Sequence, residues 1–263
     1  MFARTLLFNV VFYVNFAVQA LLFSPFLLLP ERYGTWVTKF WTASSLFWHR
    51  LITGIGEETK GLENIPQGAC IVACKHQSTW ETMRLVYMFD KPAYILKREL
   101  MWIPLLGWYL KKYGHIPVDR GSRSKALASI VVHARQRKAT GYQILIFPEG
   151  TRRPPLAEPH YRYGVVHLYK ELGLPVVPVA LNAGLYWPRR SFAHVPGTVR
   201  VQVLPPIEPG LEPSAFAVRL EATLEEATNK LIEKAFETDP ATRPPGWAPK
   251  RDEAAEAAEP KLA

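Results

Sequence analysis

Cysteine is scarce in this sequence. Its 263 residues include only Cys70 and Cys74, which excludes a secreted scaffold held together by disulfides. The two lie four positions apart in a predicted strand, where their side chains are too far apart to form a disulfide. We therefore predict that both are reduced core residues. No zinc-binding pattern can be built from them, and we expect no bound metal or other cofactor.

Charge is missing from the N-terminal region. No Asp, Glu, Lys or Arg occurs between Thr5 and Pro30, and about 20 apolar residues are enough to cross a bilayer. Residues 33–55 are rich in aromatic side chains, and Trp and Tyr favour the membrane–water boundary. The alternative is a pair of core helices in a soluble bundle, although core helices seldom lack charge over such a length. We predict a helical pair over residues 5–55, spanning or half-inserted in a membrane, and assign residues 1–55 to this membrane-engaging segment.

The C-terminal region is poor in the large apolar residues that a core needs. Residues 239–263 are dominated by proline, alanine and glutamate, a composition that favours disorder. The whole chain is 48% hydrophobic, so we expect residues 56–238 to form a folded domain. A net charge of +9 favours anionic partners: nucleic acid, an acidic membrane surface or phosphorylated small molecules.

The central region alternates short apolar runs with helical periodicity. The runs are typical of strands covered on both faces, and the alternation predicts an α/β fold with a mostly parallel sheet flanked by helices. The predicted strands are Ala69–Cys74, Ala93–Leu96, His115–Val118, Gln143–Phe147, Val176–Leu181 and Val199–Leu204. The predicted helices are Ser78–Phe89, Arg98–Tyr113, Arg123–Arg137, Tyr163–Leu172 and a last helix from about Pro213 to Ala235.

A histidine and a carboxylate follow the first of these strands. His76 comes just before a predicted helix and Glu81 lies one turn into it. At this spacing the carboxylate can hold one ring nitrogen protonated and leave the other free as a base. The same spacing arises by chance in many chains, and a helix-capping histidine is the alternative. Ser78 resembles a nucleophile, but Ser-x-x-Glu is also a capping box, which is the interpretation we prefer.

Basic residues follow other predicted strands. Phe147–Arg152 ends one strand, Ile116–Arg123 spans the end of another, and Lys97 closes a third. Ligands of parallel sheets bind outside the carboxyl ends of the strands, so these groups can converge on one anionic ligand. The alternatives are solvated turns, for which Pro-Glu-Gly is suitable.

Together these motifs resemble the four blocks of the glycerolipid acyltransferases. The blocks are His-Gln-Ser-Thr-Trp-Glu at 76–81, Val-Asp-Arg at 118–120, Phe-Pro-Glu-Gly-Thr-Arg at 147–152 and Val-Val-Pro-Val-Ala at 176–180. The pattern is most similar to that of the bacterial 1-acylglycerol-3-phosphate acyltransferases, over about residues 60–210. The resemblance implies an α/β catalytic domain over residues 56–238.

The resemblance also implies roles for individual residues. His76 stands at the position of the catalytic base. Glu81 stands where the family usually has Asp, and Lys75 where Asn is common. The positions implied to bind the phosphate or the acceptor are Lys97, Arg120, Glu149, Gly150, Thr151 and Arg152. For Glu149 two roles stay open, binding of the acceptor's polar groups or ordering of the loop.

The implied reaction moves an acyl chain from acyl-CoA or acyl-carrier protein to the sn-2 hydroxyl of 1-acylglycerol-3-phosphate, making phosphatidic acid. We expect an enzyme on the cytoplasmic face of the inner membrane, with lysophosphatidic acid and membrane lipid as partners. The acyl chain needs an apolar groove, for which Met101, Trp102, Leu105, Leu106 and Trp108 are candidates; core or membrane contact is the alternative there.

Two other functions stay open. One is acyl transfer to another lysolipid, such as a lyso-ornithine lipid or a lysophospholipid. The other is a non-catalytic protein that binds anionic lipid through its basic loops. We expect no nucleic-acid partner, because such binding explains the net charge but neither the uncharged N-terminal segment nor the order of the motifs.

Overall fold

The computed structural model describes residues 2–119 and 123–248. Its described residues form a seven-stranded sheet in the order β1-β7-β6-β2-β5-β3-β4. β6 and β7 are antiparallel and every other neighbouring pair is parallel, which confirms the predicted mostly parallel sheet. The strands are β1 (Ile55–Lys60), β2 (Ile71–Cys74), β3 (Pro92–Lys97), β4 (Ile116–Val118), β5 (Gln143–Ile146), β6 (Val176–Leu181) and β7 (Gly197–Val203).

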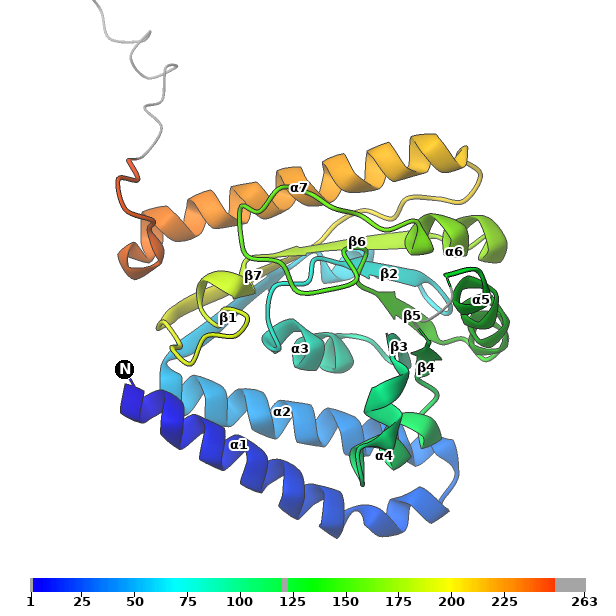
Figure 1. Ribbon diagram of the computed structural model, residues 1–263, viewed down its shortest axis with the longest axis horizontal. Helices are drawn as coiled ribbons and strands as arrows, with labels where there is room; N and C mark the ends of the chain where they lie inside the picture. The colour runs from blue at the N-terminus through cyan, green and yellow to red at the C-terminus, as the bar shows by residue number, and fades with distance from the viewer. Residues whose placement is uncertain (1, 120–122, 249–263) are drawn as a thin grey trace, which may run out of the picture.

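Helices cover both faces of this sheet (Figure 1). On one face α5 (Arg123–Ala139), α6 (Gly164–Leu172) and α7 (Pro213–Thr238) pack on the sheet. On the other face lies α3 (Trp80–Met88). Because the central strands are covered on both sides, every residue of β6 is buried, which explains its continuously apolar sequence. Cys70 and Cys74 are buried free thiols in the core beside α3, as predicted.

Two local predictions are wrong. β1 was not predicted, because this strand lies at the edge of the sheet and its sequence, Ile-Gly-Glu-Glu-Thr-Lys, is mostly polar. The predicted helix Arg98–Tyr113 is divided into a 3₁₀ segment, η4 (Arg98–Trp102), and a short helix, α4 (Leu106–Lys112). Pro104 lies between them and lacks the N–H that a continuous helix needs.

The N-terminal region is the predicted helical pair. α1 (Phe2–Leu22) and α2 (Gly34–Thr53) lie side by side, joined by η1 (Ser24–Leu28) and η2 (Glu31–Tyr33), and α2 packs against α3 (Figure 1). Polar side chains join the pair: the Asn15 amide donates to the Ser44 hydroxyl at 3.0 Å and the Gln19 amide donates to the same hydroxyl at 2.9 Å. α4 also contacts α1, where the Tyr109 hydroxyl donates to the Ala20 carbonyl at 2.8 Å.

Apolar side chains cover the outer surface of this pair. Among the described helices, α1 is the one that is long and apolar enough to cross a membrane. A core helix of a soluble bundle would bury such side chains, whereas here most of them are exposed. The exposed set on α1 and α2 includes Leu7, Val10, Tyr13, Val14, Val18, Leu21, Trp36, Phe47 and Leu51.

A cluster of aromatic and histidine rings joins the helical pair to the sheet domain. His194, from the loop before β7, lies against Phe8 of α1, His49 of α2 and Trp187, with ring centroids 5.4, 5.2 and 4.6 Å away. His194 is 3% exposed. Burial disfavours the charged imidazolium and lowers the pKa of His194 to about 4.

This burial predicts a loss of stability in mild acid. The unfolded chain binds the His194 proton below about pH 6.5 and the folded chain binds it only near pH 4, so stability falls as the pH drops through that window. From pH 7 to pH 5 this one group costs about 2 kcal/mol. We expect the melting temperature of His194→Phe, followed by tryptophan fluorescence, to fall less over this range than that of the wild type, by roughly 4–8 °C. Equal falls in the two proteins would contradict this account.

The predicted C-terminal tail starts where α7 ends. Its first residues are described to 248 and include η6 (Pro240–Thr242). Asp239 accepts a hydrogen bond from the Tyr186 hydroxyl at 2.6 Å and pairs with Arg200 at 3.4 Å. These contacts tie the start of the tail to the sheet domain. Residues 249–263 lie outside the described residues.

Candidate active site

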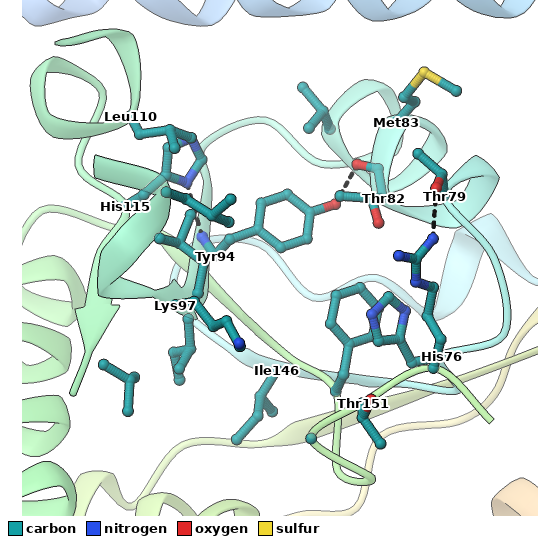
Figure 2. A pocket seen from close by; sticks show the side chains of 18 of the residues that line it. His76, Thr79, Thr82, Met83, Tyr94, Lys97, Leu110, His115, Ile146 and Thr151 are labelled. Atoms are coloured by element: carbon teal, nitrogen blue, oxygen red, sulfur yellow. Dashed lines mark hydrogen bonds between the residues drawn. The ribbon is translucent and has the colours of Figure 1, made fainter. Parts of the chain in front are cut away.

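The predicted motifs that follow β2, β3 and β5 lie together at the carboxyl ends of these strands. β2, β5, β3 and β4 are consecutive and parallel, so their carboxyl ends lie together. They open into a cavity of about 1480 Å³ that reaches from the sheet edge to α1 and α2. Figure 2 shows His76 and Thr151 at one side of this cavity and Lys97 at the other. The predicted site residues that line it are His76, Lys97, Gly150, Thr151 and Arg152.

His76 and Glu81 form the predicted pair. The His76 Nδ1 atom lies 2.9 Å from the Glu81 Oε1 atom. The same oxygen accepts the backbone N–H groups of Gln77 at 2.8 Å and Ser78 at 2.7 Å, and Glu81 is fully buried. A carboxylate at this position favours the tautomer with the ring proton on Nδ1, which leaves Nε2 free to accept a proton.

Ser78 has the capping role that we preferred to a nucleophilic one. It is 0% exposed, and its hydroxyl oxygen accepts the backbone N–H of Trp80, in the first turn of α3, at 3.2 Å. Its own N–H is held by Glu81. The start of α3 is therefore a closed hydrogen-bonded unit that positions His76 just before the helix.

The His76 backbone and ring are fixed from several sides. Its ring stacks on the Phe147 ring, with centroids 3.8 Å apart and planes 14° from parallel. Its carbonyl accepts the Arg153 N–H at 2.8 Å, and its own N–H donates to Glu149 Oε2 at 2.9 Å. The loop after β5 therefore holds the residue that follows β2, which leaves the imidazole little freedom to turn.

Glu149 lies behind the cavity wall and is absent from its described lining. It is 2% exposed. One carboxylate oxygen accepts the His76 N–H, and the other lies 2.8 Å from the Lys75 ammonium. Of the two roles left open by the sequence, the contacts of Glu149 correspond to ordering of the loop.

The charges of Lys97 and Arg152 in the cavity are not neutralised by carboxylates of the described residues. The Arg152 guanidinium donates to the neutral Thr79 hydroxyl at 2.8 Å. Lys97, at the end of β3, extends from the strand toward the cavity (Figure 2). In the described parts of the chain neither cation forms an ion pair with a carboxylate. Arg120, the third predicted cation, lies outside the described residues.

Two further arginines line the cavity and were not predicted. Arg189 donates to the Arg152 carbonyl at 2.8 Å. Arg162 lies over Gly150, whose φ of 67° suits glycine, and a Cβ atom at Gly150 would come within 2.8 Å of the Arg162 side chain. Arg189 follows β6, a parallel neighbour of β2. Lys97 and Arg152 were predicted because ligands of parallel sheets bind outside the carboxyl ends of the strands, and the same argument applies to Arg189.

The remainder of the cavity lining is largely apolar. Of the five residues predicted for an acyl groove, Leu106 lines the cavity. Trp102 and Trp108 are instead exposed on the outer surface, by 72% and 58%, so the groove prediction is wrong for them. The apolar lining comes from α1 and α2 as well as from the sheet domain, and includes Phe16, Phe23, Val37, Trp41, Leu110, Ile130 and Ile146.

Comparison with known proteins shows the family to which the chain belongs. The acyltransferase family model matches residues 58–182. The chain is 39% identical over 182 residues to a 1-acyl-sn-glycerol-3-phosphate acyltransferase of Pseudomonas aeruginosa, and the match covers 69% of this chain and 70% of that protein. The chain belongs to the 1-acyl-sn-glycerol-3-phosphate acyltransferase family. It is an acyltransferase, and the resemblance seen in its motifs is confirmed.

Other members of the family agree with this assignment. A 1-acyl-sn-glycerol-3-phosphate acyltransferase of Escherichia coli is 29% identical over 145 residues, which cover 54% of this acyltransferase and 58% of that protein. The crystal structure of the 1-acyl-sn-glycerophosphate acyltransferase of Thermotoga maritima matches with a TM-score of 0.72 at 21% identity, over 87% of this chain and 97% of that one. At this identity the structural match shows a shared fold.

Proposed function

We propose that this acyltransferase moves an acyl chain from a thioester donor to the sn-2 hydroxyl of 1-acylglycerol-3-phosphate, making phosphatidic acid. One observation carries the proposal: His76, paired with Glu81, lines a cavity that is also lined by the cations Lys97 and Arg152 and by largely apolar walls. Such a cavity suits a substrate with a phosphate at one end, a hydroxyl in the middle and a hydrocarbon chain at the other. The donor is acyl-CoA or acyl-carrier protein.

In the proposed reaction His76 acts as general base and then as general acid. Its Nε2 atom removes the hydroxyl proton while the oxygen attacks the thioester carbonyl carbon. Glu81 stabilises the imidazolium that forms. The tetrahedral intermediate then expels the sulfur, the carbon–sulfur bond breaks, and the imidazolium returns its proton to the thiolate. The products are the ester and a free thiol, and no acyl-enzyme forms.

The cations position the acceptor in this proposal. Lys97 and Arg152 bind the phosphate, and Arg120 is expected to join them. Arginine suits this role because its planar guanidinium can form two hydrogen bonds to one phosphate. Holding the phosphate fixes the distance between the hydroxyl and His76, which converts binding energy into orientation.

We also propose that the enzyme works at a membrane surface. The exposed apolar side chains of α1 and α2, together with the exposed Trp102 of η4 and Trp108 of α4, support insertion of this side into lipid. The basic residues that follow Pro30 suit the cytoplasmic face, where acyl donors are found. The acceptor would then enter the cavity from the membrane.

The test measures free thiol released by detergent-purified enzyme from oleoyl-CoA with a panel of lysolipids. We expect release with lysophosphatidic acid and a KM for it at least about tenfold higher in Arg152→Gln, since one charged contact to phosphate is lost. Release with a phosphate-free lysolipid alone, unchanged in Arg152→Gln, would assign a different acceptor. No release with any acceptor, with either acyl-CoA or acyl-carrier protein as donor, would contradict an acyl-transfer function.

A further inference from the structure

A buried ionic cluster lies directly behind His76. The Lys75 ammonium is 2.8 Å from Glu149 Oε1 and 2.6 Å from Glu225 Oε1, with side-chain exposures of 6%, 2% and 18%. Glu225 belongs to α7. Tyr161 completes the cluster, since its hydroxyl donates to Glu225 Oε1 at 2.7 Å and the ammonium lies 5.5 Å from the centre of its ring. None of these four residues is part of the described cavity lining.

The cluster is connected to the base through a single carboxylate. Glu149 binds Lys75 with one oxygen and the His76 backbone N–H with the other, at 2.9 Å. Lys75 and His76 are consecutive residues that extend β2, where successive side chains point to opposite sides. The Lys75 side chain therefore reaches the α7 side while the imidazole reaches the cavity, and Glu149 joins the two.

The charges of the cluster explain why Lys75 is needed. The buried carboxylate of Glu149 and the partly exposed carboxylate of Glu225 lie beside one ammonium, and removal of the ammonium would leave two uncompensated negative charges close together. Buried ion pairs add little net stability compared with apolar packing. What this cluster supplies is geometry: with Lys75 in place, Glu149 has one orientation, and in that orientation it holds the His76 backbone.

We propose that Lys75 is a positioning residue for the His76 base. It holds Glu149 against the His76 amide and anchors this arrangement to α7 through Glu225. The inference depends on the proposed role of His76. A shift of about 1 Å in the position of a reacting group can cost about 10²-fold in rate, so the effect should lie in kcat while substrate binding is preserved.

The test compares three variants with the wild-type enzyme in the thiol-release assay. For Lys75→Met we expect kcat to fall about 10–100-fold with KM for both substrates within about twofold. Glu225→Ala removes the anchor on α7 but leaves Lys75 paired with Glu149, and a fall in kcat of about 3–10-fold is expected. In the double variant Lys75→Met/Glu225→Gln one of the two carboxylates is neutralised, so kcat should recover several-fold over Lys75→Met.

A matched control is available on the same helix. Lys230 pairs with Glu226 on the exposed surface of α7 at 2.6 Å, and Lys230→Met should keep the wild-type kcat and KM. If Lys75 had only a general structural role, Lys75→Met would have a lower melting temperature, and kcat would not recover in the double variant Lys75→Met/Glu225→Gln. If Lys75→Met is obtained only unfolded, Glu225→Ala carries the test, because its side chain is partly exposed and its removal leaves no buried charge unpaired.

The outcomes separate this inference from the proposed function. The positioning role is supported by a loss confined to kcat together with recovery in the double variant. It is overturned if Lys75→Met keeps kcat within twofold, if the loss lies in KM, or if the double variant is no faster than Lys75→Met. His76→Ala is assayed in parallel. If the wild type transfers the acyl chain and His76→Ala does not, the proposed role of His76 is supported independently of the result for Lys75.

Discussion

Replacement of His76 by alanine is expected to reduce kcat by about 10²–10⁴-fold, the usual contribution of a general base. The imidazole lines the cavity, and the hydrogen bond from its Nδ1 side to Glu81 leaves the Nε2 atom free to accept a proton. KM for lysophosphatidic acid should change little, because in the proposed function Lys97 and Arg152 bind the phosphate. Thiol release at saturating concentrations of both substrates measures the loss.

The matched control is Ser78→Ala. The Ser78 hydroxyl caps α3 and takes no part in the proposed reaction, so kcat should stay within about threefold of the wild type. Loss of the cap should cost about 1 kcal/mol of stability. A variant His76→Ala that keeps more than a tenth of the wild-type kcat, or Ser78→Ala that loses all activity, would contradict the assignment of the base.

The second large effect is expected for Glu81→Gln. The glutamine carbonyl oxygen still accepts the backbone N–H groups of Gln77 and Ser78, so the start of α3 should remain folded. The negative charge that stabilises the imidazolium is lost, and an amide can hold the ring in the wrong tautomer. We expect kcat to fall about 10²–10⁴-fold with a melting temperature close to that of the wild type.

The variant Glu81→Asp tests whether the length of the residue 81 side chain matters in addition to its negative charge. Aspartate keeps the charge but is one methylene shorter, so the 2.9 Å contact to His76 would lengthen by about the length of one bond. An intermediate loss of activity is expected, larger than for Ser78→Ala and smaller than for Glu81→Gln. Wild-type kcat in Glu81→Gln would show that the carboxylate is unnecessary, and the proposed role of Glu81 would be wrong.

Strands could be predicted from the sequence where a continuous run of apolar residues indicates that the strand is buried. Val176–Leu181 was predicted to the residue because β6 is buried along its whole length. β1 could not be found in the same way, since its pairing with β7 connects residues far apart in the chain and its side chains are partly polar. The break at Pro104 was visible in the sequence, but the periodicity of the flanking residues outweighed it.

In the candidate site, contacts between residues close in sequence could be predicted and contacts between distant residues could not. The contact between His76 and Glu81 was predictable because both residues lie at the start of one helix. The partners of Lys75 could not be predicted, since Glu149 and Glu225 are 74 and 150 residues away from it. Local spacing carries no information on such pairs. For this reason the sequence left two roles open for Glu149, and the structure adds the contacts that bear on the choice.

The walls of the cavity affect how this enzyme can be handled. Phe16 belongs to α1 and Phe23 directly follows this helix, while Val37 and Trp41 belong to α2, yet all four line the same cavity as His76. A truncated protein that begins at β1 would lose one side of the cavity together with the exposed apolar surface of α1 and α2. We therefore expect a protein trimmed at the N-terminus to lose activity as well as apolar surface, and an amphiphile used to extract the intact enzyme to compete with the substrate for the apolar cavity.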